Sequence, residues 1–251
     1  MADAAPTAGG VARPTMAAAG ANTSPAGQSA PAGRAADVER TIVVLLGPPG
    51  AGKGTQGEQL AAALGIPKVA TGDVLRAAVR DGTSLGQEAQ AFMERGDLVP
   101  DPVILGIMKE ALSQPATVRG AILDGVIRTV PQAEGLQAVL EQLGRVTTVV
   151  LVFAIDDDVL VRRISERTVC EACQTPYTGH HTGTACPKCG GRLVRRSDDE
   201  PTAVRQRLAV YHAQTAPVIT WYKTHGVRVV SIDAVGTRAE VQARVLRAFS
   251  R

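Results

Sequence analysis

The sequence has few aromatic residues, no long apolar run and almost no excess charge. Phe, Trp and Tyr together make up 3% of the 251 residues. No stretch approaches the roughly 18 uninterrupted apolar residues of a membrane-spanning helix, so we expect a soluble protein. The formal charge of +3 is too small to indicate a nucleic-acid partner by itself. The 45% apolar content is enough for one main domain with a sizeable core.

Large apolar side chains are scarce at the N-terminus. Residues 1–38 consist almost wholly of Ala, Gly, Pro, Ser and Thr, a composition that cannot bury enough surface to offset its ordering entropy. A targeting peptide is the alternative, but the segment has no apolar stretch of the kind that a signal peptide needs. We therefore expect a disordered tail at 1–38 and a folded domain at 39–251.

Cysteine is absent outside one short segment. The four cysteines form two Cys-x₂-Cys pairs separated by twelve residues, a spacing that favours a tetrahedral zinc site over a disulfide framework and suits a reducing cytoplasm. With four thiolates and no free position, the metal is expected to be structural. Iron also suits four thiolates. The expected ligands are Cys170, Cys173, Cys186 and Cys189.

Two other interpretations concern the residues around these cysteines. His180 and His181 lie between the pairs, but adjacent histidines in a polar loop are more often solvated than bound to metal. A zinc ribbon that binds nucleic acid is the functional rival for the segment. The scarcity of aromatic residues counts against it, because stacking on aromatic side chains is a main source of single-strand affinity.

Apolar runs and helical spacing alternate along the rest of the chain. Strands are expected at 41–46, 121–123, 146–155 and 227–232, with helices at 53–64, 132–143, 157–166, 202–222 and 237–249. This alternation predicts an α/β fold with a doubly wound parallel sheet. Two stretches interrupt it, at 70–99 and 167–197, and each is long enough to be a functional insert.

A glycine-rich loop joins the first strand to the first helix. Its sequence, GPPGAGKGT at 47–55, matches a phosphate-binding loop in the context that such a loop requires. Glycines let backbone N–H groups turn toward phosphate oxygens, the helix N-terminus favours anions, and Lys53 can reach the outer phosphates of a bound ligand. A glycine-rich turn that binds nothing would require both the lysine and the strand-loop-helix setting to be accidental.

The residues after Lys53 narrow the class of P-loop protein. Gly54 stands where most P-loops have a Ser or Thr that binds Mg²⁺, and Thr55 comes one position later. Further motifs follow in order: TGDVLR at 71–76, GDLVPD at 96–101, LDGVIRTVPQ at 123–132, RISERT at 163–168, RRSDD at 195–199 and TAVRQRL at 202–208. Together they make the sequence similar to the adenylate kinase family, in its form with a zinc-bearing lid.

This resemblance implies a fold, a reaction and a set of site residues. The fold would be a P-loop NTPase-type doubly wound parallel sheet with a helical insert for the nucleoside monophosphate at 70–99 and a zinc lid at 167–197. The reaction would be the reversible transfer of the γ-phosphoryl group of ATP to AMP, with Mg²⁺ bound to ATP. The expected catalytic residues are Lys53, Asp124, Arg128, Arg163, Arg167, Arg196 and Arg207.

The resemblance also assigns the two nucleotides. The expected ATP-binding residues are Gly50, Ala51, Gly52, Lys53, Gly54, Thr55, Arg167, Tyr177 and Arg238. The expected AMP-binding residues are Thr71, Arg76, Leu98, Val99, Gly125, Arg128, Gln132, Arg196 and Arg207. Thr71 and Gln132 would contact adenine, and Asp124 would hold Mg²⁺ through water. For the TGDVLR segment alone, an unrelated helix start with Asp73 as N-cap is an equal alternative.

The sequence departs from the family pattern at three places. Val126-Ile127 replaces Phe-Pro before Arg128, Glu166 replaces a glycine at the lid hinge, and Thr168 replaces an arginine. We expect Glu166 to stiffen the hinge and to bring an anion near the triphosphate. These departures favour two alternatives, a kinase for another nucleoside monophosphate and a nucleotide-binding homologue with impaired catalysis. We expect a cytoplasmic monomer with no nucleic-acid or membrane partner.

Overall fold

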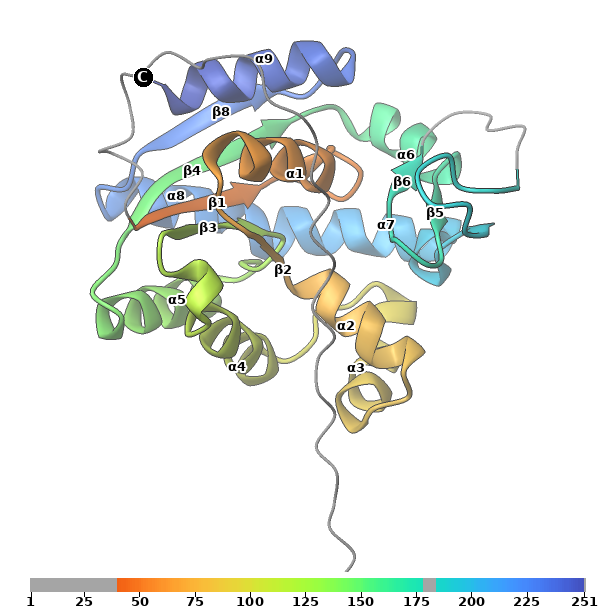
Figure 1. Cartoon of the computed structure of the whole chain (residues 1–251), viewed down its shortest axis with the longest axis horizontal. Coiled ribbons are helices and arrows are strands. Elements are labelled where there is room, and N and C mark those ends of the chain that lie inside the picture. Colours follow the sequence, from red (N-terminus) through yellow and green to blue (C-terminus); the bar gives the residue numbers. More distant parts are fainter. Residues whose placement is uncertain (1–39, 178–183, 251) are drawn as a thin grey trace, which may run out of the picture. The chain divides into compact units, whose positions relative to one another are not determined.

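A computed structural model describes residues 40–177 and 184–250. The expected tail at 1–38, His180 and His181 lie outside these residues. The main sheet is five-stranded, with the order β2-β3-β1-β4-β8, and all its neighbouring strands are parallel (Figure 1). Its strands are β1 (Thr41–Leu46), β2 (Lys68–Ala70), β3 (Gly120–Asp124), β4 (Thr147–Ala154) and β8 (Val229–Asp233). The predicted doubly wound parallel sheet is confirmed.

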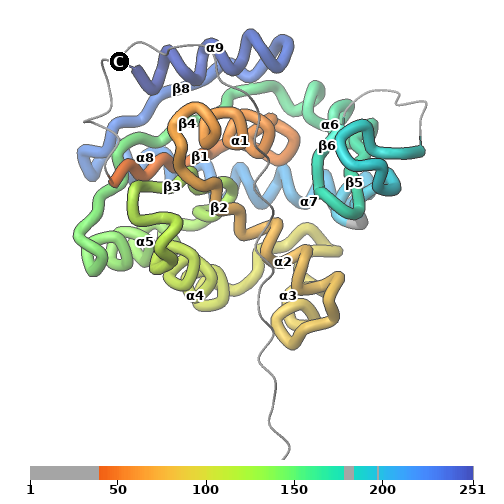
Figure 2. The backbone as a smooth tube through the Cα atoms, in the orientation of Figure 1, coloured from red at the N-terminus to blue at the C-terminus, as the bar shows by residue number. Residues whose placement is uncertain are grey.

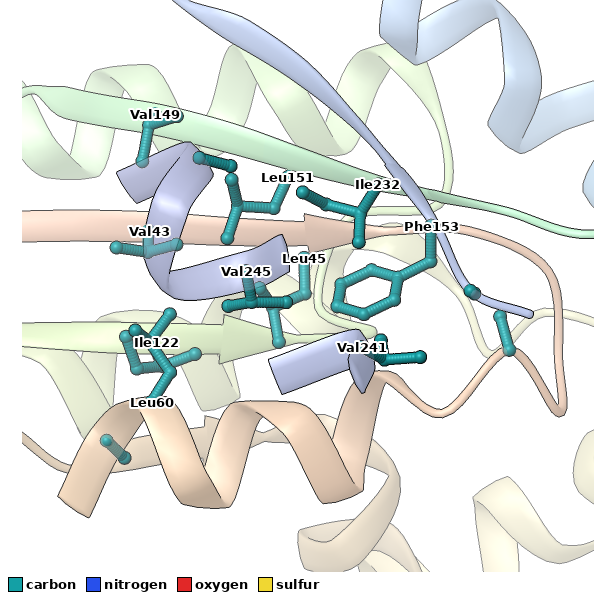
Figure 3. Close-up of a cluster of buried hydrophobic side chains, with 14 of the residues drawn as sticks. Val43, Leu45, Leu60, Ile122, Val149, Leu151, Phe153, Ile232, Val241 and Val245 are labelled. Carbon is teal, nitrogen blue, oxygen red and sulfur yellow. The ribbon is translucent and has the colours of Figure 1, made fainter. Parts of the chain in front are cut away.

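Helices cover both faces of this sheet, which explains why its strands are almost continuously apolar. The helices are α1 (Lys53–Leu64), α4 (Asp101–Leu112), α5 (Val130–Gln142), α6 (Asp157–Ser165), α7 (Pro201–Val210), α8 (Ala216–Thr224) and α9 (Arg238–Phe249). All six residues of β1 are buried, and they alternate between two cores. Val43 and Leu45 pack with α1, α6, α7 and α9, as Figure 3 shows for part of this cluster. Ile42, Val44 and Leu46 pack with α4, α5 and α8 on the other face.

The predicted helix at 202–222 is interrupted by a turn of different geometry. The π-helical segment Tyr211–Thr215 separates α7 from α8, and Pro217 follows it at the second position of α8. Proline has no N–H to donate to the preceding turn, which is a physical reason for the change of geometry at this point. The structure also contains β2 and α4, which the sequence pattern did not predict.

The stretch at 70–99 forms two adjacent helices, which can be followed along the backbone in Figure 2. α2 (Thr71–Arg80) and α3 (Ser84–Arg95) enclose a small core of their own with α4. The helices approach so closely that a Cβ on Gly86 would lie 2.1 Å from the carbonyl oxygen of Ala78. Because α2 begins at Thr71, Asp73 lies inside its first turn and is not the N-cap. That alternative interpretation of TGDVLR is therefore wrong.

The stretch at 167–197 contains a second, three-stranded antiparallel sheet with the order β6-β5-β7. Its strands are β5 (Thr168–Cys170), β6 (Pro176–Tyr177) and β7 (Leu193–Val194). We call β5, β6 and β7 together the cysteine sheet. A 3₁₀ turn at Ser197–Asp199 leads from the cysteine sheet back to α7. A second 3₁₀ turn, at Pro115–Thr117, precedes β3. None of the helices in the described ranges is long and apolar enough to cross a membrane.

Candidate functional site

The glycine-rich loop lies between the carboxyl end of β1 and the first turn of α1. Gly50 and Gly52 have φ values of 81° and 90°, which a residue with a side chain rarely adopts. A Cβ on Gly47 would lie 2.8 Å from the carbonyl oxygen of Phe153 in β4. No side chain caps the start of α1. The N–H groups of its first turn are therefore available to an anion, as a P-loop requires.

Lys53 points back into this loop. Its Nζ donates hydrogen bonds to the carbonyl oxygens of Gly47 at 2.6 Å and Pro48 at 2.8 Å. Burial, which has the largest effect, and the positive charges of Arg128 and Arg207 together lower the pKa of Lys53 to about 8, although the negative charge of Asp124 opposes them. The ammonium group thus lacks a full counter-charge, which a phosphate group would supply.

The structure brings all the predicted catalytic residues to a single cavity of about 180 Å³ beside the P-loop. They come from α1, β3, the β3–α5 loop, α6, the cysteine sheet's two connections and α7. The residues that line this phosphate cavity include Lys53, Asp124, Arg128, Arg163, Arg167, Arg196 and Arg207. Their convergence makes this the most cationic cavity described in the chain.

The charges of these arginines are only partly balanced. Burial, with a smaller contribution from nearby arginines, lowers the pKa of both Arg128 and Arg196 to about 10. Within the described residues, the Nε atoms of Arg76 and Arg196 are buried and have no hydrogen-bond partner. Buried donors without an acceptor are rare and costly, so these two groups are suited to oxygen atoms of a bound phosphate.

Two aspartates hold two of the arginines in place. The Asp199 carboxylate is fully buried and accepts hydrogen bonds from Nε and Nη2 of Arg167, the first at 2.8 Å. Arg207 Nη1 lies 3.1 Å from Asp198 and 3.4 Å from Asp199. Burial alone would raise the pKa of Asp198, but Arg207 and Arg76 keep it below its usual value. Both aspartates lie in the RRSDD motif at 195–199, but no role for them was predicted from it.

Arg128 is fixed through its backbone. Its N–H donates to Oε1 of Gln132 at 2.7 Å, its carbonyl oxygen accepts from the Thr215 hydroxyl at 2.9 Å, and its Nε donates to the Gly125 carbonyl at 3.1 Å. Val126 and Ile127, which replace Phe-Pro, are each 1% exposed and pack in the core. The departure therefore leaves Arg128 anchored and lining the phosphate cavity. Thr215, in the π-helical turn, carries no signal in the sequence that would have identified it.

The predicted AMP-binding residues line a second cavity of about 60 Å³, next to the first. We call it the acceptor cavity. Arg76, Gly125, Arg128 and Arg207 line both cavities, so the two spaces meet at these residues. Arg196, which was also predicted to bind AMP, lines the phosphate cavity but not the acceptor cavity. The predicted residues that line the acceptor cavity are Thr71, Arg76, Leu98, Val99, Gly125, Arg128, Gln132 and Arg207.

A third cavity, of about 290 Å³, lies on the other side of the P-loop. Its lining includes Gly50, Ala51, Gly52, Thr55 and Arg238 of the predicted ATP-binding set, together with Arg163. The structure places Tyr177 elsewhere. Its side chain is buried, and its hydroxyl oxygen lies 3.1 Å from Sγ of Cys186. The neighbouring Pro176, whose carbonyl oxygen accepts a hydrogen bond from Arg238 at 3.4 Å, lines this cavity instead.

Glu166, between α6 and β5, does not have the position that was expected for it at the lid hinge. Glu166 ends α6 with φ −93° and ψ −1°, a conformation open to any residue, so no glycine is needed there. Its side chain is exposed and lines none of the cavities described above. The expected anion near the triphosphate is therefore absent from the lining of the phosphate cavity. Thr168 begins β5, where it pairs with Tyr177.

The four cysteines meet beside the cysteine sheet, and Cys170 is the one that lies in a strand of it. Their Sγ atoms all lie within 4.8 Å of one another, with 3.4 Å between Cys170 and Cys189 and 3.7 Å between Cys173 and Cys186. Four sulfur atoms about 2.3 Å from a central zinc ion lie roughly 3.8 Å apart, so the arrangement suits a tetrahedral metal. A Cβ on Gly191 would lie 2.8 Å from Sγ of Cys170, which explains the glycine beside the site.

One further positively charged residue, Lys68, lines the phosphate cavity without having been predicted. Lys68, in β2, has a side chain that is 14% exposed and lies within 4.0 Å of three carboxylates. A lone lysine in a three-residue strand has no motif to mark it. Its position depends on the pairing of β2 with β3, which places Ala70 opposite Asp124.

Comparison with known proteins agrees with this geometry. A family model described as Adenylate kinase matches residues 45–227. The chain is 62% identical over 210 residues to the adenylate kinase of Gemmatimonas aurantiaca, covering 83% of this chain and 98% of that protein. It is 47% identical over 195 residues to the adenylate kinase of Methanosarcina acetivorans, covering 76% of this chain and 90% of that protein. It is 43% identical over 214 residues to the adenylate kinase of Citrifermentans bemidjiense, covering 82% of this chain and 98% of that protein. The chain therefore belongs to the adenylate kinase family.

Proposed function

We propose that this protein transfers the γ-phosphoryl group of ATP to AMP, giving two molecules of ADP, and catalyses the reverse reaction. The observation that carries the proposal is the contact between two cavities. The phosphate cavity contains the P-loop and the cationic cluster, and it shares Arg76, Arg128 and Arg207 with the acceptor cavity. A phosphoryl group located at the shared arginines could be reached from either side.

The donor side would be formed by the P-loop and the cavity behind it. The N–H groups from Gly50 to Thr55 would bind the phosphates of ATP, and Lys53 would exchange its two carbonyl partners for phosphate oxygens. Arg163 and Arg238 line the third cavity, which is the space left for the ribose and base of ATP. Tyr177 would contribute by supporting the cysteines beneath Pro176 rather than by direct contact.

The acceptor side would be formed by α2 and by the segment that follows α3. Leu98 and Val99 supply an apolar wall, while Thr71 and Gln132 supply polar atoms for the base. The Gln132 amide is engaged in the structure, since Oε1 accepts from Arg128 and Nε2 donates to Asp101 at 2.7 Å. We infer that AMP replaces the Asp101 contact when it binds.

Two metals complete the proposal. Asp124, with a side chain 14% exposed at the carboxyl end of β3, faces the phosphate cavity and offers the oxygen ligand that Mg²⁺ favours. Mg²⁺ bound with ATP would neutralise part of the phosphate charge. At the other site, the four thiolates would hold Zn²⁺ as a structural metal, and iron is the other metal that four thiolates suit. We also propose a cytoplasmic monomer, since a reducing compartment keeps these thiols available.

The residues of the chain would act by position and charge, since phosphoryl transfer needs no protein nucleophile. Arg128, Arg163, Arg167, Arg196 and Arg207 would surround the transferred group with donors suited to phosphate oxygens. Asp198 and Asp199 would keep two of these arginines oriented before the nucleotides arrive. Closure of 70–99 and 167–197 over the cavities would exclude water and prevent hydrolysis of ATP.

A coupled assay of ADP formation with AMP, GMP, CMP and UMP tests the proposal. We expect turnover with AMP and at least about tenfold less with the other three, because a base that leaves buried polar atoms unpaired is rejected strongly. Gln132→Ala should reduce this preference, and Gln137→Ala, an exposed position on the same helix, should not. Turnover with another monophosphate would indicate a different acceptor. ATP binding without turnover on any of them would indicate a nucleotide-binding homologue and contradict the proposal.

A further inference from the structure

Lys68 brings a positive charge to the place where the phosphate cavity also needs a metal. Its stem lies across α1, where a Cβ on Gly57 would be 3.4 Å from Cδ of Lys68. Its Nζ lies 3.9 Å from the position of a Cβ on Gly54. These glycines are three residues apart and therefore share one face of the helix. The absence of side chains there leaves the channel in which Lys68 reaches the cavity.

Three carboxylates face the Lys68 ammonium group. Its Nζ donates a hydrogen bond to Glu58 at 3.2 Å and lies 3.7 Å from Asp73 and 4.0 Å from Asp124. Glu58 is half exposed, so it holds the lysine at the rim of the cavity. Asp124 is the most buried of the three, with 14% of its side chain exposed. Its Oδ2 lies 3.1 Å from the position of a Cβ on Gly54, next to the P-loop.

We propose that Lys68 is a positioning residue that competes with magnesium for the Asp124 carboxylate and so sets how strongly nucleotide binding depends on the metal. The inference rests on the proposed function, because it takes Asp124 to face the magnesium bound with ATP. A fixed positive charge close to this carboxylate repels a divalent cation that approaches the same oxygen atoms. The same charge attracts the phosphates of ATP when no metal accompanies them.

Two opposite effects follow from this geometry. Loss of the Lys68 charge weakens the binding of metal-free ATP, because one of the cations of the cavity is gone. It also strengthens the contribution of Mg²⁺, because Asp124 no longer has a competing partner. A side chain that only stabilised the fold would change both affinities in the same direction. The ratio of the two affinities therefore reports on the proposed role.

The test uses the full chain with its thiolate-bound metal and the β,γ-imido analogue of ATP, which is not hydrolysed. Calorimetry gives the Kd of the analogue with saturating Mg²⁺ and in buffer freed of magnesium on a chelating resin. No chelator is added, so that the cysteines keep their metal. In Lys68→Met, the ratio of the metal-free Kd to the Mg²⁺ Kd should rise by roughly three- to tenfold, as for partly screened charges about 4 Å apart.

Matched variants locate the effect. Lys68→Gln should give the same rise, and Lys68→Arg should keep the ratio of the unmodified protein. Lys109→Met, which removes a charge from an exposed position on α4, should leave the ratio unchanged. In an Asp124→Asn background, Lys68→Met should change the ratio much less, because the competed carboxylate is missing.

Each other result overturns the inference. An unchanged or smaller ratio in both Lys68→Met and Lys68→Gln, with nucleotide still bound, would contradict the role of Lys68 and leave the proposed function intact. A rise of the same size in the Asp124→Asn background would contradict competition at that carboxylate. Failure of the unmodified protein to bind the analogue under either condition would overturn the proposed function and this inference together.

Discussion

The P-loop and the cysteine sheet reach their geometry by different means. The P-loop is held by the main sheet, since β1 is buried along its whole length and Gly47 fits tightly against Phe153. The cysteine sheet has strands of two or three residues, and its buried cluster consists mainly of Cys170, Cys186 and Tyr177. The first region is shaped by the core. The second has so little core that we expect its shape to depend on a metal bound by its thiolates.

This difference predicts that each region can be disabled without unfolding the other. Loss of a charge in the P-loop should affect the chemistry and leave the cysteine sheet intact. Loss of the metal should affect the cysteine sheet and leave the main sheet folded. The five predictions below test this separation, from the largest expected effect to the smallest.

Lys53→Met should have the largest effect. Removal of one preorganised donor to a reacting phosphate costs about 10²- to 10³-fold in kcat. The melting temperature should not fall, because burial disfavours the charged form of Lys53 and methionine has a similar length. Turnover and differential scanning calorimetry on the same sample check both points. If the melting temperature and the activity both fell strongly, Lys53 would be a structural residue of the loop.

Removal of the thiolate-bound metal should have the next largest effect. We expect the Kd for ATP to rise by at least about tenfold, because metal binding and local folding are the same process in such small sites. The far-UV circular dichroism of the main sheet and helices should change little. Metal content by mass spectrometry, measured before and after chelation, serves as the control. Cooperative loss of all secondary structure on chelation would contradict the independence of the two regions.

The pKa of Lys53 predicts a pH dependence that belongs to the P-loop alone. Its pKa in the folded protein is about 8, below the ordinary value of 10.5. The folded state therefore binds this proton less well than the unfolded state, and Lys53 lowers stability below pH 8. That penalty disappears as the pH rises from about 8 to 10.5.

Nucleotide binding should reverse this shift, because phosphate stabilises the charged lysine. ATP binding should take up a proton near pH 8 to 9, and the affinity should fall by up to about tenfold per pH unit above pH 8. Calorimetry in two buffers of different ionisation enthalpy measures the uptake. Lys53→Met should abolish it. Equal proton uptake in the variant would assign the titration to another group.

Thr215→Val tests how Arg128 is anchored. Loss of the hydroxyl leaves the Arg128 carbonyl without a partner, at a cost of about 1 kcal/mol in the free energy of unfolding. If the loss of this hydrogen bond also displaces Arg128, kcat should fall roughly fivefold, and the Kd for ATP should be unchanged. Thr220→Val, at an exposed position on α8, is the matched control. Equal kinetics in the two variants would show that Thr215 does not position Arg128.

Glu166→Gly should have the smallest effect, although it restores the glycine of the family pattern. Glu166 is exposed, its backbone conformation does not need glycine, and it lines none of the three nucleotide cavities. We expect kcat to change by less than about twofold, within the range of ordinary surface substitutions. Steady-state kinetics checks this. A several-fold gain in kcat would show that the junction between the two regions limits turnover.

The sequence predicted the parts of the site that are local in the chain. The P-loop and the paired cysteines lie in short segments with fixed spacing, and the arginines lie in motifs that resemble those of a known family. The structure brings the arginines and Lys53 to one cavity and the four cysteines to one cluster. Strands and helices with clear apolar patterns were predicted to within a few residues. The pattern did not reveal β2, which has only three residues and a lysine at its start.

The parts that escaped prediction depend on packing between distant segments. Lys68 matters because β2 pairs with β3 and because two glycines open a channel across α1. Thr215 matters because a π-helical turn directs its hydroxyl to a carbonyl 87 positions earlier. Asp199 is notable for full burial between two arginines. No local pattern encodes these relations, because each arises only when the sheet has assembled.

The most direct test of the account is the stoichiometry of the reaction at the shared arginines. Purified protein with ATP, AMP and Mg²⁺ should form two molecules of ADP for each ATP consumed, and none with ATP alone. ADP formed from ATP without AMP, in the ratio of one to one, would mean that water reaches the phosphate cavity as the acceptor. That result would contradict the central claim that the two cavities meet to pass a phosphoryl group between nucleotides.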